Sequence, residues 1–239
     1  MQTNTNAIVL SKLKYRENDL IVKCYTEKFG VVSFLLRGIL KNKKGGAKVA
    51  YFQLLSQLQL EIIFKPNRSL QSVKEVKINQ FYSSLHSNVL KSAIVMFLAE
   101  VLSSTLKEEE ENELLFSYLE TTLQWLDNHN DFANFHLLFL LKLTKYFGFY
   151  PENPLPESNS FNLLEGRFET VTQNKNSVSG GNLTLLKQLL GTTFDTLNNV
   201  KISAKQRQSF LNMILHYFEL HLGSFRTPKS LQIFNQVFS

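Results

Sequence analysis

The sequence DLIVKCYTEKFGVVSFLLR, residues 19–37, contains two alternating apolar runs joined by a short link that includes a glycine. The apolar residues that share one face are Leu20, Val22, Cys24, Val32, Phe34 and Leu36. A period of two is typical of half-buried β-strands, because successive side chains point to opposite faces of a sheet. The stretch therefore predicts a β-hairpin, with strands over 19–26 and 31–37 and with Lys23 turned outward.

Three further runs lie around this hairpin, over residues 7–13, 58–64 and, more weakly, 70–78. Five strands within about 75 residues predict a small closed sheet of the OB type, a five-stranded barrel whose ligand face lies on its second and third strands. We therefore expect residues 1–80 to form an OB-fold barrel.

The hairpin is followed by a basic loop, RGILKNKKGGAK, residues 37–48, which holds five cations and no acid. Gly38, Gly45 and Gly46 free the backbone there, which predicts a flexible loop that presents positive charge to a polyanion. A solvated lysine loop that only keeps the protein soluble remains the alternative interpretation.

The formal net charge of +6 is unevenly distributed over the 239 residues. Residues 1–80 hold 14 Lys/Arg and five Asp/Glu, a net charge of +9, whereas residues 81–239 hold 12 and 15, a net charge of −3. This asymmetry favours a nucleic-acid partner for the N-terminal part, and protein contacts or plain solubility for the rest.

Candidate DNA-binding residues follow from the expected loops and ligand face of the barrel. They are Lys14, Tyr15, Arg16, Lys23, Arg37, Lys41, Lys43, Lys44, Lys48, Lys65 and Arg68. The cations would follow phosphates, and Tyr15 would either stack on a base or pack against the barrel wall. Because no base-reading pattern is visible, we expect sequence-tolerant binding that weakens with added salt.

Beyond residue 80 the apolar period changes to about 3.6, which predicts helices. The expected helices cover 89–101, 112–126, 132–147 (capped by Asp131 and ended by Gly148), 182–190, a helix opened by a Ser203–Gln206 capping box and closed by Gly223, and 230–238. The fold class is therefore α+β, with an OB-fold domain over 1–80 and a helical domain over 81–239. Residues 149–181, rich in Pro, Gly, Asn and Ser, are expected to be a long irregular insertion.

Catalytic signatures are missing from the sequence. There is no glycine-rich phosphate motif, no His-Glu-x-x-His and no nucleophile elbow, so we expect neither an enzyme nor a cofactor. Cys24, the only cysteine, is expected to be a buried thiol, and His136 a satisfied core residue rather than a ligand. Glu165 and Glu169 are expected on a solvated loop. No apolar run reaches the roughly 18 residues that span a bilayer, and the N-terminus has no secretory pattern, so we expect no membrane partner and a cytoplasmic protein.

The order of several short motifs resembles the bacterial RecO family. These motifs are Ala7-Ile-Val-Leu10 with Tyr15, Glu17 and Asp19; Tyr25 to Gly30 before Arg37-Gly38; Leu140-Leu141 to Phe147-Gly-Phe-Tyr-Pro151; and Tyr217-Phe218 to His221-Leu222 before Lys229-Ser-Leu231. The resemblance extends over essentially the whole chain.

The resemblance implies a nucleoid-associated DNA repair and recombination mediator. Its OB domain would bind single- and double-stranded DNA, and its helical domain would dock the acidic, Phe-ending tail of single-strand-binding protein (SSB). With RecR it would help to load RecA on SSB-coated strands, or would anneal complementary strands. A basic-rimmed apolar groove suits such a tail, and the candidate rims are Lys142, Lys145, Lys187, Arg207 and Arg226.

The chain departs from the resemblance at one point. Many RecO proteins carry a four-cysteine zinc site in the stretch that corresponds to Pro151–Gly181, where this sequence has no cysteine. Since Asn, Glu and Ser do not suit a structural zinc centre, we expect no metal there. We also expect a small hairpin from Phe161 to Phe168 around Gly166.

These observations favour a non-enzymatic DNA-binding mediator that requires no small-molecule substrate. The alternative is a helical scaffold protein whose basic barrel binds acidic proteins.

Overall fold

The computed structural model describes residues 1–41, 48–106, 111–171 and 175–238. They divide into two compact units. The first comprises Met1–Asn128 and Pro228–Ser230, and the second comprises His129–Thr227 and Leu231–Ser239. The first unit therefore extends past the strands of the first 80 residues into the helical part of the chain.

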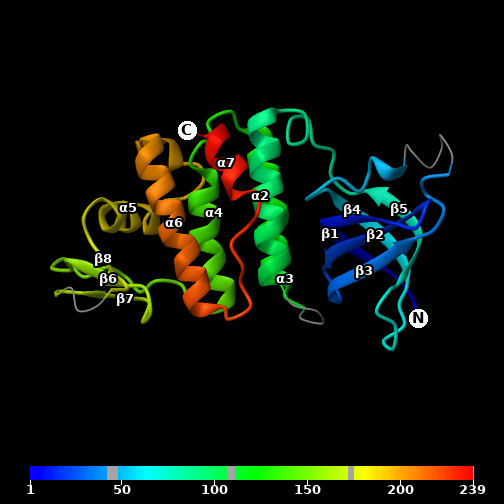
Figure 1. The fold of residues 1–239 in the computed structure, drawn as a ribbon, viewed down its shortest axis with the longest axis horizontal. Helices are drawn as coiled ribbons and strands as arrows, with labels where there is room; N and C mark the ends of the chain where they lie inside the picture. Colours follow the sequence, from blue (N-terminus) through cyan, green and yellow to red (C-terminus); the bar gives the residue numbers. More distant parts are fainter. Residues whose placement is uncertain (42–47, 107–110, 172–174, 239) are drawn as a thin grey trace. The chain divides into compact units, whose positions relative to one another are not determined.

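Five antiparallel strands form the N-terminal sheet, in the order β3-β2-β1-β4-β5 (Figure 1). They are β1 (Gln2–Tyr15), β2 (Asp19–Thr26), β3 (Gly30–Leu36), β4 (Gln57–Ile63) and β5 (Ser72–Ile78). The sheet closes through Gln71, directly before β5: Leu35 N–H donates to the Gln71 carbonyl (3.0 Å), and Gln71 N–H donates to the Ser33 carbonyl (2.9 Å). The expected fold class, a five-stranded sheet followed by helices and consistent with an OB fold, is confirmed.

Strand β1 is longer than the run over 7–13 that its apolar pattern predicted. Gln2–Ile8 pair with β4, and Ala7–Tyr15 pair with β2, across a register shift between Val9 and Ser11. The N-terminal end of β1 thus pairs with β4 and its C-terminal end with β2. These pairings extend the strand into polar sequence, because ladder hydrogen bonds stabilise residues that contribute nothing to the core.

The barrel core holds the predicted inner face of the hairpin. Its fully buried members include Val22, Cys24, Phe34, Phe52, Leu58, Leu60 and Ile62. Cys24 is 0% exposed, and burial raises the pKa of its thiol, so the expectation of an inert buried cysteine is confirmed.

Helices α2 (Val89–Thr105) and α3 (Glu113–Asn128) complete the first unit. Asn88 caps α2 by accepting from the N–H groups of Leu90 and Lys91. Hydrogen bonds join α3 and the residue before it to the barrel, among them Gln57 Nε2 to the Glu120 carbonyl (2.9 Å) and Tyr25 Oη to the Asn112 carbonyl (3.3 Å). These bonds explain why the first unit extends to Asn128.

The connection between β5 and α2 is fixed by a buried charge. Asp127 accepts hydrogen bonds from the backbone N–H groups of Ser83, Ser84 and Leu85. Lys91, 1% exposed, donates to the Asp127 carbonyl and the Ser84 hydroxyl, both at 2.7 Å. Since buried charges require such partners, the network determines where α2 begins relative to α3.

The second unit is helical apart from one small sheet. Its helices are α4 (Phe135–Leu143), η1 (Thr144–Phe147), α5 (Gly180–Leu190), η2 (Leu197–Asn199), α6 (Ala204–His221) and α7 (Leu231–Val237). No described helix has the length and apolar character needed to cross a membrane.

Helix α4 is shorter than the helix predicted over 132–147. It begins at Phe135, because residues 132–134 form a turn in which Phe135 N–H donates to the Phe132 carbonyl (2.9 Å). The predicted cap by Asp131 is therefore wrong, and Asn134 takes the cap position. The predicted end is correct: after the 3₁₀ turn η1, Gly148 adopts φ +80° and closes the helix.

Helix α6 begins at the predicted cap. The Ser203 hydroxyl accepts from Gln206 N–H (3.2 Å), but the Gln206 side chain donates to the Gly181 carbonyl (3.4 Å), so the reciprocal half of the capping box is not formed. Leu222, rather than Gly223, is the C-terminal cap residue.

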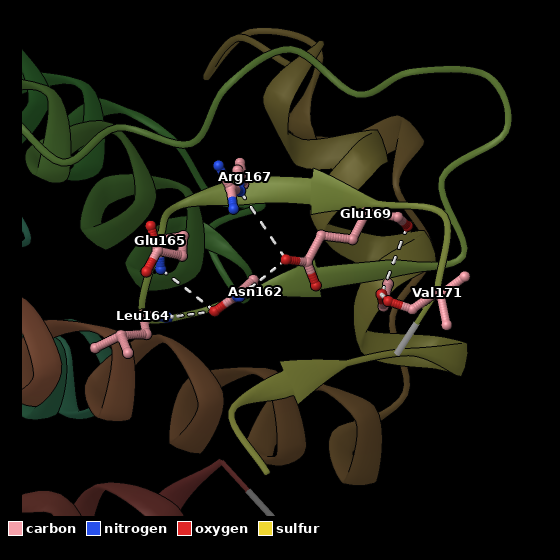
Figure 2. Close-up of polar contacts among 7 residues, drawn as sticks. Asn162, Leu164, Glu165, Arg167, Glu169 and Val171 are labelled. Atoms are coloured by element: carbon pink, nitrogen blue, oxygen red, sulfur yellow. Dashed lines mark hydrogen bonds and ion pairs between the residues drawn. The ribbon is translucent and has the colours of Figure 1, made fainter. Parts of the chain in front are cut away.

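Residues expected to be irregular contain a three-stranded sheet in the order β7-β6-β8. Its strands are β6 (Ser160–Asn162), β7 (Arg167–Glu169) and β8 (Ser177–Val178). The predicted hairpin is confirmed, with Phe161 opposite Phe168. Figure 2 shows its polar side: Asn162 Oδ1 accepts from the N–H groups of Leu164 and Glu165, while Asn162 Nδ2 donates to Glu169 Oε1 (2.9 Å).

Helix α6 holds this sheet in place. Tyr217 Oη donates to the Phe149 carbonyl (2.6 Å), and His221 Nε2 bonds to the Leu163 carbonyl (2.8 Å). Gly166, at the hairpin turn, has φ +69°, and a Cβ there would lie 2.8 Å from Tyr217 Oη. Only glycine combines this backbone conformation with such a close approach.

We expect Gly166→Ala to destabilise the protein by about 2 kcal/mol, since it adds left-handed strain and disrupts the buried Tyr217 hydrogen bond. Thermal unfolding measures the effect. Gly223→Ala is the matched control, because nothing lies within 4 Å of its added Cβ. Equal melting temperatures for the two variants would contradict this account.

Candidate functional site

One face of the barrel carries three rows of side chains across β1, β2 and β3. Directly paired residues share a face, so the strand registers give the rows Ser11–Lys23–Ser33, Leu13–Ile21–Leu35, and Tyr15–Asp19 with Arg37 directly after β3. This outer face contains two predicted cations, the predicted aromatic residue and an apolar centre. It is the face that OB folds use for ligands.

A cavity of about 560 Å³ lies beside this face, where β3 meets β5. It is lined by Leu35, Leu36, Arg37, Ile39, Lys48, Phe52, Ser72, Val73, Lys74 and Val76. Arg37 and Lys48, predicted from opposite ends of the basic loop, thus come together at one cavity. Three cations and no carboxylate are among the lining residues, so the cavity is suited to an anionic ligand.

The loop between β4 and β5 is held by Gln71, which is 4% exposed. Its side-chain amide donates to the carbonyls of Lys65 (2.8 Å) and Arg68 (2.7 Å), and its oxygen accepts from Lys65 N–H (2.8 Å). Since the backbone of Gln71 pairs with Ser33 and Leu35, this loop is anchored beside β3. The predicted residues Lys65 and Arg68 are both exposed there.

The predicted DNA-binding residues at the tip of the β1–β2 hairpin do not all face the same way. The Arg16 guanidinium lies 5.2 Å from the centroid of the Tyr15 ring and so covers part of the surface that would stack on a base. Lys14 pairs with the buried Leu20, which places it on the opposite face from Lys23. Alternation along β1 therefore separates these two predicted residues, although Lys14 is exposed.

The basic loop is only partly described. Lys41 and Lys48 are exposed. Lys43 and Lys44, together with the predicted flexibility of this loop, lie outside the described residues.

Sequence reasoning missed the cavity itself. Lys74 and Val73 belong to the weakest of the predicted strands, and Phe52 lies in a segment without alternation. No local pattern shows that these residues converge, because closure of the barrel brings them together. The sequence signal was the basic loop, which ends at Lys48, shortly before Phe52.

In the second unit, the five candidate cations differ in their surroundings. Lys145 and Arg226 are exposed, and Lys142 is half-buried. Lys187 is engaged in packing, since its Nζ donates to the Ser158 carbonyl (2.8 Å). Arg207 is the one of the five that lines a described cavity.

This second cavity, of about 220 Å³, lies among α4, α6 and α7. It is lined by His136, Ala204, Lys205, Arg207, Gln208, Leu211, Phe234, Asn235 and Phe238. Arg207 Nη1 donates to Asn134 Oδ1 (3.0 Å), while Arg207 Nε is buried without a hydrogen-bond partner. An apolar cavity with a buried unpaired N–H is suited to a ligand that combines an apolar group with an anion.

His136 is also on this cavity and is 0% exposed. Neither ring nitrogen has a hydrogen-bond partner, and the ring packs edge-on against Phe234, with 4.7 Å between centroids. Burial, with a smaller contribution from the Arg207 charge, lowers the pKa of His136 to about 3. The expectation of a core position is confirmed, but the expectation that its polar atoms are satisfied is wrong.

The side chains of the small sheet do not fit a zinc ion. Asn162 uses both its oxygen and its amide in hydrogen bonds, and Glu169 Oε1 is shared by Asn162 and, at 4.0 Å, Arg167 (Figure 2). Glu165 is exposed, as expected for a solvated loop, whereas Glu169 lies in β7 and belongs to this network, so the expectation of a solvated loop is wrong for Glu169. Among the described residues there is no group of three metal-ligating side chains.

Comparisons with known proteins agree along the whole chain. The family model described as Recombination protein O N terminal matches residues 1–82, and that described as Recombination protein O C terminal matches residues 86–231. The chain is 46% identical over 238 residues to the DNA repair protein RecO of Christiangramia forsetii and 42% identical over 239 residues to that of Flavobacterium psychrophilum. It is 35% identical over 242 residues to that of Bacteroides fragilis, and each comparison covers 100% of both chains.

The lowered pKa of His136 predicts an acid-sensitive stability. The unfolded chain takes up this proton near pH 6.5, whereas the folded chain does so only near pH 3, so this contribution is complete above pH 6.5 and decreases as the pH falls. Between pH 7 and pH 5 we expect the free energy of unfolding of the wild type to fall by about 2 kcal/mol more than that of His136→Leu or His136→Gln. Urea unfolding at both pH values measures this, and parallel losses in all three proteins would refute it.

Proposed function

The chain belongs to the RecO family of DNA repair proteins, and from this premise we propose that it is a DNA-binding recombination mediator. The observation that supports this most strongly is that Arg37 and Lys48 line one cavity of an OB-type barrel, next to the outer face that carries Lys23. The proposal does not require catalysis.

DNA binding would depend mainly on phosphate neutralisation. Residues 1–80 carry a net charge of +9, and Lys65 and Arg68 are held beside the same strand as Arg37. Cations of this kind replace condensed counterions, so affinity would be largely independent of base sequence and would decrease with salt.

Strand annealing follows from the same charges. Two complementary strands repel each other through their phosphates, and a basic surface that holds both reduces this repulsion and raises their effective concentration. The protein would accelerate pairing by proximity, without making or breaking a covalent bond.

We further propose that the cavity at His136 and Arg207 takes the tail of SSB. A terminal carboxylate would accept from Arg207, and an aromatic side chain would pack beside Leu211 and Phe238, which line the cavity. Together with RecR, such docking would bring the protein to SSB-coated strands and help RecA to load.

The alternative function is a scaffold whose basic barrel binds acidic proteins. Salt dependence alone does not separate the two, since both are electrostatic. The alternative would be favoured if affinity for single-stranded DNA were no better than that of an unrelated basic protein of equal charge.

Replacing Lys41, Lys43, Lys44 and Lys48 with Ala should weaken binding to single-stranded DNA. The slope of log K against log salt is negative, and each lost phosphate contact reduces its magnitude by about 0.7, so the four substitutions should reduce the magnitude by up to about 3. Titration of a labelled oligonucleotide over a range of salt concentrations measures both quantities.

The matched control removes four exposed lysines of the second unit, Lys145, Lys175, Lys201 and Lys205. Its net charge equals that of the test variant. If both variants lose affinity equally, the barrel loop has no special role and only the total charge matters.

Arg207→Ala should weaken binding of an acidic peptide ending in Phe by at least about tenfold, because a charge-assisted hydrogen bond is lost. Lys187→Ala is the control, since Lys187 is held by Ser158. The same peptide with an amidated C-terminus should bind wild type weakly. Fluorescence anisotropy measures the affinity in each of these three experiments. Equal peptide affinity of Arg207→Ala and wild type would mean that the tail binds elsewhere.

A further inference from the structure

The cavity between β3 and β5 has an apolar floor that phosphate binding does not use. Its apolar lining includes Ile39, Phe52, Val73 and Val76. Phe52 is 1% exposed, whereas the other three are half-buried and so present part of their surface to the cavity. A volume of about 560 Å³ lies within the range of about 300–1,000 Å³ typical of small-ligand sites.

An apolar row leads across the outer face to this floor. Leu13, which is 66% exposed, pairs with Ile21, and Ile21 pairs with Leu35, which also lines the cavity. An exposed leucine beside a half-buried apolar row marks a surface that prefers an apolar ligand to water. The row and the cavity thus form one continuous apolar path through the basic face.

Charges at the rim select the kind of ligand. Arg37 and Lys48 have no ion pair among the described residues, and the Lys74 ammonium is held by the Gln2 side chain (2.5 Å). The nearest acid in the strand register, Asp19, already accepts from Gly38 N–H (2.7 Å). The rim therefore favours a ligand that is anionic outside and flat or apolar inside.

We propose that this cavity receives one unstacked base of single-stranded DNA, with the flanking phosphates on Arg37 and Lys48. This inference rests on the proposed DNA binding and specifies its substrate. A single strand exposes its bases, whereas a duplex keeps them paired and stacked, and extracting one requires unpairing. The cavity therefore makes the protein prefer single strands to duplex, with little choice among the four bases.

The test compares two labelled oligonucleotides of equal length, one with normal bases and one abasic throughout. The full chain should bind the abasic strand about tenfold more weakly at the same salt concentration, because base contacts are lost and phosphate contacts remain. Ser72→Trp, which fills the cavity from an exposed lining position, should lose this tenfold preference but keep the affinity for the abasic strand.

Ser117→Trp on α3 is the matched control, since Ser117 is exposed and does not line the cavity, and this variant should bind both strands as wild type does. A duplex of the same sequence should bind wild type and Ser72→Trp equally.

Two outcomes overturn the inference while leaving the proposed function intact: equal binding of both strands by wild type, or a preference unchanged in Ser72→Trp. If wild type binds neither strand better than an unrelated basic protein does, the proposed function itself fails. Retained affinity of Ser72→Trp for the abasic strand shows that the variant is folded.

Discussion

Closure of the barrel by Gln71 is the constraint on which the candidate interface depends. Its backbone joins β3 to β5, and its side chain holds the carbonyls of Lys65 and Arg68. One buried residue therefore fixes both the sheet and the position of a basic loop beside it. Because buried amides require hydrogen-bond partners, these bonds favour the observed arrangement of the loop.

The sequence was sufficient for the local parts of this structure. Alternation located the β2–β3 hairpin and its buried face, and Ser203 and Gly148 marked real helix ends. Prediction from the sequence failed where contacts outside the local pattern determine the bounds of an element. Strand β1 is longer than predicted because two neighbouring strands pair with it, and α4 starts late because a turn precedes it. Neither effect leaves a local pattern.

The candidate site residues were likewise predicted only as far as local sequence allowed. Composition indicated which part of the chain is basic, but it did not separate Lys14 from Lys23 or single out Arg207 from the other cations of the second unit. His136 was predicted to be buried, yet its unpaired nitrogens appear only once α7 is packed beside it. A pocket forms only when the chain closes and packs. A single sequence therefore indicates the charged residues of a pocket better than the apolar residues that line it.

The chain returns to its first unit once, at Pro228–Ser230, where Ser230 N–H donates to the Glu100 carboxylate (3.1 Å). The first unit is consequently discontinuous in sequence. A protein truncated after Asn128 would leave the Glu100 carboxylate on α2 without this donor, so the fragment would lack one contact of the first unit. Genetic dissection of this protein is better done by substitution than by deletion.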